Sequence, residues 1–290
     1  MAEIRPMRFG EILDGSLKLY IHNFGLFLPL AIASLSVPAA LFLYFMFNKG
    51  PEFLAMAPMM MQGIVDWSTI GFLFVIGFVY MLGSMMLQAG AIRVVSDSYL
   101  GRTTTFGQAI ALGASKIFPL FLVSLAKGIL MVLLGGLVGA ACLVAVAVIG
   151  TGGGLLAALA IGLVGGVLVV WVAAGYGVTT PVVVLEQLRS FFDAFGRSWD
   201  LTKGSRARIV GLAIVAGLLF NVVPNGILSF VSDEVMKSSP AGGMTLKILS
   251  YVIVVLLYPA LSCVFTLIYY DLRVRREAFD LQVLSQQLGA

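Results

Sequence analysis

Long apolar runs alternate with short polar segments along the whole chain. A bilayer core about 30 Å thick needs roughly 20 apolar residues for one helical span. Six runs meet that length, at about 24–47, 69–95, 117–148, 155–185, 208–231 and 247–270. The polar segments between them are too short for a separate soluble domain. The pattern therefore predicts an all-α membrane protein with six transmembrane helices in one polytopic domain, residues 1–290.

A second pattern precedes each pair of predicted spans. In the first polar segment, apolar positions recur at helical spacing and the charged residues lie away from them. Segment 9–17 aligns without gaps with segment 191–199, and segment 106–110 occupies the same place before the third span. We therefore expect three repeats, each an amphipathic helix plus a membrane hairpin, at about 7–100, 104–188 and 190–276. A C-terminal cytoplasmic helix is expected at 277–288.

The basic residues predict how the chain is oriented. Fourteen of the 18 Lys and Arg lie before the first span, between spans two and three or four and five, or after the sixth. Only Lys49, Lys237 and Lys247 lie on the opposite side, and Lys127 is inside a span. Short loops rich in Lys and Arg stay cytoplasmic. Both the N and the C terminus are therefore expected to face the cytoplasm.

The amino-acid composition limits the kinds of partner and cofactor that the chain is expected to bind. The chain is 60% hydrophobic and 11% charged, with a mean hydropathy of +1.04 and a formal charge of +4. The one-sided placement of Lys and Arg explains the positive charge, so we expect a bilayer with anionic headgroups as partner and no nucleic acid. The chain has one histidine, and its two cysteines lie inside predicted spans. These residues are too few and too scattered to predict a metal site or a catalytic cluster. No cofactor is expected.

Lys127 is the one basic residue well inside a predicted span. An intramembrane charge is costly and is a candidate for a functional site. It also has a structural explanation, because a long lysine side chain can extend to the interface. Other polar residues inside or beside the spans are candidates for the same intramembrane site: Ser124, Gln88, Asn221 and Asn225.

Each predicted hairpin ends with an acidic residue close to an arginine. These pairs are Asp97 with Arg93, Glu186 with Arg189, and Asp271 with Arg273. They predict a ring of cytoplasmic ion pairs that closes the bundle, or alternatively a gate or headgroup site. Within spans three and four, small residues at spacings of four allow helices to approach closely, which predicts helix packing at Gly135, Gly139, Gly162 and Gly166.

Four segments resemble a known family. The opening 8–20, the segment 96–102, the stretch Arg197-Ser198-Trp199-Asp200-Leu201-Thr202-Lys203-Gly204 and the segment 269–277 are similar to the prokaryotic glycerophosphoryl diester phosphodiesterase membrane-domain family. In larger members of that family, the phosphodiesterase activity belongs to an appended soluble barrel. This chain has no such barrel, so the resemblance implies a stand-alone membrane domain and no catalytic residue.

These observations lead to a functional expectation. We expect a non-enzymatic integral membrane scaffold or anchor that organises a protein partner at its cytoplasmic amphipathic helices. The resemblance implies a multi-pass protein of the bacterial or archaeal cytoplasmic (inner) membrane. The alternative is a small-solute or lipid transporter with a site near Lys127.

Overall fold

The computed structural model describes residues 5–61, 66–279 and 281, and every regular element within them is helical. The long helices are broken at two places, and short helices connect them. In chain order the elements are α1 Phe9–His22, α2 Phe24–Met61, α3 Trp67–Tyr99, α4 Phe106–Ser115, α5 Ile117–Ile149, α6 Thr151–Gly175, α7 Thr179–Leu185, α8 Asp193–Thr202, α9 Arg206–Gly217, the π-helix η1 Leu218–Val222, α10 Val223–Ser238 and α11 Pro240–Glu277.

All six predicted spans are confirmed as helices that are long and apolar enough to cross a membrane. The fourth span, Thr151–Leu185, consists of α6 and α7 with a break between them. The fifth, Arg206–Ser238, passes from α9 through η1 into α10. By length and hydropathy, the chain is a multi-pass helical membrane protein.

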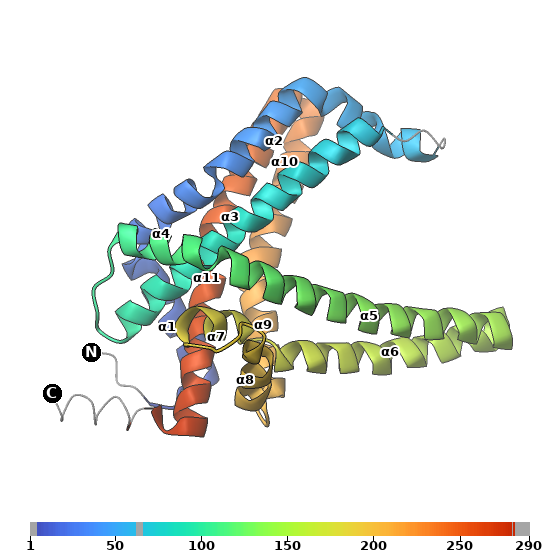
Figure 1. The fold of residues 1–290 in the computed structure, drawn as a ribbon. Helices are drawn as coiled ribbons and strands as arrows, with labels where there is room; N and C mark the ends of the chain where they lie inside the picture. The colour runs from blue at the N-terminus through green and yellow to red at the C-terminus, as the bar shows by residue number, and fades with distance from the viewer. Residues whose placement is uncertain (1–4, 62–65, 280, 282–290) are drawn as a thin grey trace.

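The spans pair as three antiparallel hairpins. The pairs are α2 with α3, α5 with α6, and the α9–α10 segment with α11. Figure 1 shows the first and third hairpins side by side, while the α5–α6 hairpin diverges from both. The short helices α1, α4, α7 and α8 gather at the end of the molecule where the hairpins meet. We call it the basic end, because the 14 clustered Lys and Arg belong to it.

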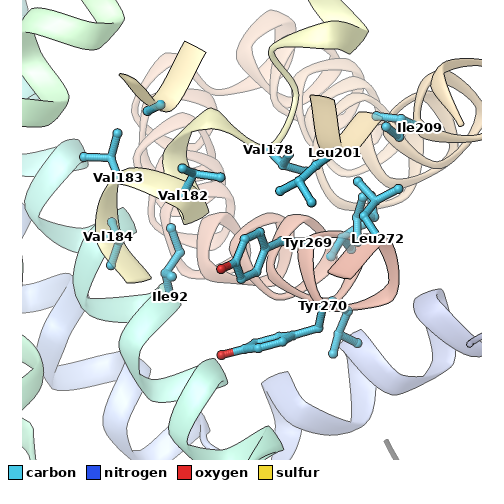
Figure 2. Close-up of a cluster of buried hydrophobic side chains, with 14 of the residues drawn as sticks. Ile92, Val178, Val182, Val183, Val184, Leu201, Ile209, Tyr269, Tyr270 and Leu272 are labelled. Carbon is cyan, nitrogen blue, oxygen red and sulfur yellow. The ribbon is translucent and has the colours of Figure 1, made fainter. Parts of the chain in front are cut away.

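The main hydrophobic core lies at the basic end. Figure 2 shows Tyr269 and Tyr270 of α11 at its centre, with Ile92 of α3 and the valines of α7 near them. Leu201 of α8 and Ile209 of α9 belong to the same buried cluster. Few side chains of α5 and α6 are buried. The α5–α6 hairpin is therefore joined to the others at one end and exposes apolar surface along its length, whereas α11 also packs against α2 and α3 further from that end.

The amphipathic helices bury equivalent positions of the predicted repeat. Ile12, Ala109 and Ala194 align with one another, and all three are buried. One turn further on, the aligned positions Ser16, Gly113 and Ser198 are buried too. On α1, the buried face packs against α11, while the apolar residues Phe9 and Leu17 remain 38% and 43% exposed. These helices are therefore held by the protein as well as facing outward.

Local sequence signals fix several helix ends. Asp66 caps α3, accepting hydrogen bonds from the Ser68 backbone N–H at 3.0 Å and from the Thr69 hydroxyl at 2.5 Å. Gly150 has a φ of +88° between α5 and α6, which glycine adopts without steric cost. The helix α11 ends at Glu277. Most of the predicted C-terminal helix 277–288 lies outside the described residues.

The predicted glycine contacts between α5 and α6 are only partly correct. A Cβ added at Gly135, Gly139 or Gly166 would meet nothing within 4 Å, so these glycines do not lie at the helix contact. At Gly162 the nearest atom is the Cys142 sulfur, at 3.9 Å. The close approach is at Gly165, where a Cβ would lie 2.6 Å from two Val138 methyl carbons. The spacing of small residues in the sequence did not reveal which face of each helix meets its neighbour.

Candidate functional site

A cavity of about 280 Å³ lies where the α5–α6 hairpin leaves the rest of the bundle. It is bounded by α3, α5, the break between α6 and α7, and α11. Gln88 and Lys127, two of the predicted polar candidates, both line it. The other lining residues are Ile92, Met131, Ala173, Tyr176, Gly177, Thr180, Pro181, Tyr258, Leu261, Ser262 and Phe265.

The polar groups of this cavity are poorly satisfied within the protein. Lys127 forms no hydrogen bond or ion pair with any residue that the structure describes. Ser262 is 4% exposed, and its Oγ has no hydrogen-bond partner among the described residues. No aspartate or glutamate is among the residues that line the cavity. It therefore combines one cation and several hydroxyl and amide groups with apolar walls.

The other predicted intramembrane candidates lie elsewhere. Ser124 lines a separate, mainly apolar cavity with Phe121 and Gly128. Asn221 lies in η1, and its side-chain oxygen accepts a hydrogen bond from the Asn225 amide at 3.3 Å. The five predicted residues therefore do not form one site. Ser124 and Lys127 line different cavities although both lie on α5, and Asn221 and Asn225 line neither of these cavities.

The acidic residues at the hairpin ends form separate clusters and not the predicted ring. Asp97 pairs with Arg93 at 2.6 Å, as predicted. Glu186 pairs with Arg197 at 2.9 Å, whereas Arg189 is exposed and forms no ion pair with a described residue. The reason is that Arg197 projects from α8, which folds back against the end of α7.

Asp271 also has different partners from the predicted one. It pairs with Arg208 and with Arg275, each at 3.0 Å, and accepts a hydrogen bond from the backbone N–H of Met7 at 2.8 Å. Arg273 instead pairs with Glu277 at 3.1 Å. The (i, i+4) spacing on α11 explains both intrahelical pairs.

Arg197 joins two acidic residues from different parts of the chain. Its guanidinium binds Glu186, at the end of α7, and Glu277, at the end of α11. The hydrogen bonds to Glu277 and then to Glu186 raise the pKa of Arg197 above its ordinary value. Arg197 therefore stays charged under all working conditions and holds the ends of the second and third hairpins together.

Three consecutive residues of α11 connect the parts of the basic end. The Tyr269 hydroxyl donates to a Glu186 carboxylate oxygen at 2.8 Å, which links the third hairpin to the second. The Tyr270 hydroxyl lies 2.6 Å from the Ser96 hydroxyl at the end of α3, in the first hairpin. Asp271 binds the Met7 backbone before α1. All three residues are buried.

The carbonyl end of α6 receives α8, a contact that the sequence did not predict. The Gly175 carbonyl oxygen accepts hydrogen bonds from the Ser198 hydroxyl at 2.9 Å and from the Thr202 hydroxyl at 3.1 Å. A Cβ at Gly175 would lie 2.5 Å from the Trp199 ring. The guanidinium of buried Arg206 lies 3.6 Å from the centre of that ring. The only signal in the sequence was the similarity of 197–204 to a family motif, which names the residues but not their partner.

No protein-family model, curated protein or solved structure matches this chain. The likeness to the glycerophosphoryl diester phosphodiesterase membrane-domain family therefore stays a prediction. What the structure itself supports is a multi-pass helical membrane protein with a polar cavity among its spans and a densely bonded basic end.

Proposed function

We propose that the protein is a non-enzymatic membrane scaffold or anchor, of the type that the family resemblance names, and that it organises a protein partner at its basic end. The observation that carries the proposal is the linkage of all three hairpins by Tyr269, Tyr270 and Asp271. Because these bonds fix the hairpin ends relative to one another, the neighbouring helices α1, α4 and α8 keep fixed positions and give the basic end a defined surface. A partner that binds a surface whose helices are already fixed does not lose free energy in ordering them, so it binds more tightly.

The charge of this surface indicates the kind of partner. Several of its cations are exposed and form no ion pair with any described residue: Arg8, Arg102, Arg189, Lys203 and Arg276. Unpaired cations on a surface attract an acidic partner and speed its association. The same cations favour contact with anionic lipid headgroups, which would hold the basic end at the cytoplasmic surface of a prokaryotic inner membrane.

Co-purification from native membranes tests the proposal. The test variant combines Arg189→Gln, Lys203→Gln and Arg276→Gln, which removes three exposed charges and no observed ion pair. The control is Lys237→Gln with Lys247→Gln, which removes two exposed charges and their ion pairs with Glu234 and Asp233 on the hairpin of α10 and α11, away from the basic end. In mild detergent, we expect a stoichiometric protein partner with the wild type and the control, and its loss with the test variant.

Two results would contradict a scaffold role. One is the absence of any stoichiometric partner, together with unchanged activity of neighbouring membrane enzymes after deletion of the protein. The other is a partner that the test variant and the control retain equally. A topology map that places Arg197 outside intact cells would contradict the cytoplasmic location of the basic end.

A further inference from the structure

The cavity around Lys127 has chemistry that the scaffold role does not use. Lys127 lies ten residues beyond the start of α5 at Ile117, which is about 15 Å along the helix. Its side chain lines the cavity among α3, α5 and α11. A lysine in the hydrocarbon region normally finds a counter-charge or reaches the interface. Here the described residues supply no counter-charge.

A buried hydroxyl on a residue that lines the same cavity also lacks a partner. The Ser262 hydroxyl comes from α11, and no described residue accepts or donates a hydrogen bond to it. Leaving a buried hydroxyl unpaired costs free energy. Gln88, Thr180 and Tyr258 bring further polar groups to the cavity from α3, α7 and α11. One ammonium and several hydroxyl and amide groups on the residues that line one cavity are complementary to an anion with more than one oxygen.

We propose that this cavity binds the phosphate group of an acidic lipid. A phosphate oxyanion would give Lys127 its missing counter-charge and give Ser262 an acceptor. The volume of about 280 Å³ lies just below the usual range for ligand pockets, roughly 300–1,000 Å³. The cavity therefore accommodates a small headgroup and not a whole lipid molecule.

The surroundings of the cavity accommodate the rest of such a ligand. Ala173, on its border, is exposed, and so are Trp171 on α6 and Ile129 on α5. These apolar surfaces face outward from the diverging hairpin, so they are available to acyl chains. The same oxyanion chemistry is also offered by free inorganic phosphate, and the experiment distinguishes the two sources.

Native mass spectrometry of the purified full-length protein tests the proposal. The protein is titrated with phosphatidic acid, with phosphatidylcholine as the neutral lipid, and with inorganic phosphate. We expect one phosphatidic acid per chain at low lipid concentration and weaker binding of phosphatidylcholine. Lys127→Met should weaken the binding of phosphatidic acid by about tenfold or more, because a charge-assisted hydrogen bond is lost. Lys237→Met, on an exposed lysine, is the matched control and should change nothing.

Ser262→Ala separates ligand binding from folding. Because the Ser262 hydroxyl has no partner among the described residues, its removal should leave the melting temperature unchanged or raise it. The same variant should weaken the binding of phosphatidic acid. Binding of inorganic phosphate that depends on Lys127, without binding of phosphatidic acid, would assign the same cavity to a soluble anion.

The proposal is overturned if neither phosphatidic acid nor phosphate binds. It is also overturned if Lys127→Met binds phosphatidic acid as tightly as the wild type. Neither result depends on the scaffold role, because the scaffold test uses other residues and a different readout.

Discussion

The Tyr269 hydroxyl donates a 2.8 Å hydrogen bond to Glu186, and this bond joins α11 to the end of α7. Tyr269 is fully buried, and Glu186 also binds Arg197. Water has little access to such a pair, so the hydrogen bond stabilises the fold more than an exposed one does. The bond connects the second and third hairpins, which otherwise diverge (Figure 1).

Tyr269→Phe is therefore expected to destabilise the protein by about 1–2 kcal/mol, because it removes only the hydroxyl of a hydrogen bond to a charged group. Thermal unfolding in detergent measures the effect. Tyr44→Phe is the control, since Tyr44 is 60% exposed and should unfold like the wild type. Equal melting temperatures for all three proteins would show that this bond does not hold the two hairpins together.

Gly165→Ala and Gly135→Ala test where α5 and α6 meet. A methyl at Gly165 would lie 2.6 Å from two carbons of Val138. We therefore expect overpacking to lower the free energy of unfolding by about 1–3 kcal/mol. Gly135 has open space around it, so the same change there should be neutral or stabilising. Thermal melting of the two variants compares them directly. A larger loss at Gly135 would mean that another helix covers that face of α5.

Arg206→Lys tests the stacking at the end of α6. The Arg206 guanidinium lies 3.6 Å from the centre of the Trp199 ring, and an ammonium has no planar face to place there. We expect the free energy of unfolding to fall by about 1–2 kcal/mol and the tryptophan emission spectrum to change. Arg189→Lys, at an exposed arginine, is the control and should alter neither. An unchanged stability and spectrum in Arg206→Lys would exclude a role for this stacking.

The N-terminal cap of α3, far from the basic end, is expected to lose its stabilising effect at low pH. Hydrogen bonds from Thr69 and then Ser68 lower the pKa of Asp66 to about 2, from an ordinary value of 3.8. Because the folded pKa is the lower one, the cap contributes its full stability above about pH 4 and loses it as the pH falls toward 2. The carboxyl carbon signal of Asp66, assigned by its loss in Asp66→Asn, should titrate near pH 2. A midpoint near 4 would show that the cap does not form.

The sequence was sufficient to predict the six spans and failed on most pairwise contacts. Hydrophobic runs identify spans because a bilayer imposes a minimum apolar length on each one. Sequence spacing identified Asp97 with Arg93, since both lie on one helix, (i, i+4) apart. Spacing predicted Arg189 as the ion-pair partner of Glu186, whereas the structure shows Arg197. The path of the chain from α7 into α8 cannot be predicted from spacing.

The residues of the candidate cavity were also only partly predictable from the sequence. Lys127 and Gln88 were identifiable as polar residues within apolar runs. Ser262 was not, because serine is common in membrane helices and only its unpaired, buried hydroxyl distinguishes it. Asn221 was grouped with Lys127 although it lies in η1 beside Asn225. Depth in the membrane is readable from a sequence, whereas the direction in which each helix faces is not.

The sequence by itself determined that this chain is helical, membrane-spanning and charged mainly at one end, because these properties follow from the solvation of individual residues. The tertiary structure alone decided which residues meet: Tyr269 with Glu186, Gly165 with Val138, and Gln88 with Lys127 around one cavity. Those contacts depend on the rotation and tilt of each helix, which are set by side-chain packing among all the helices at once.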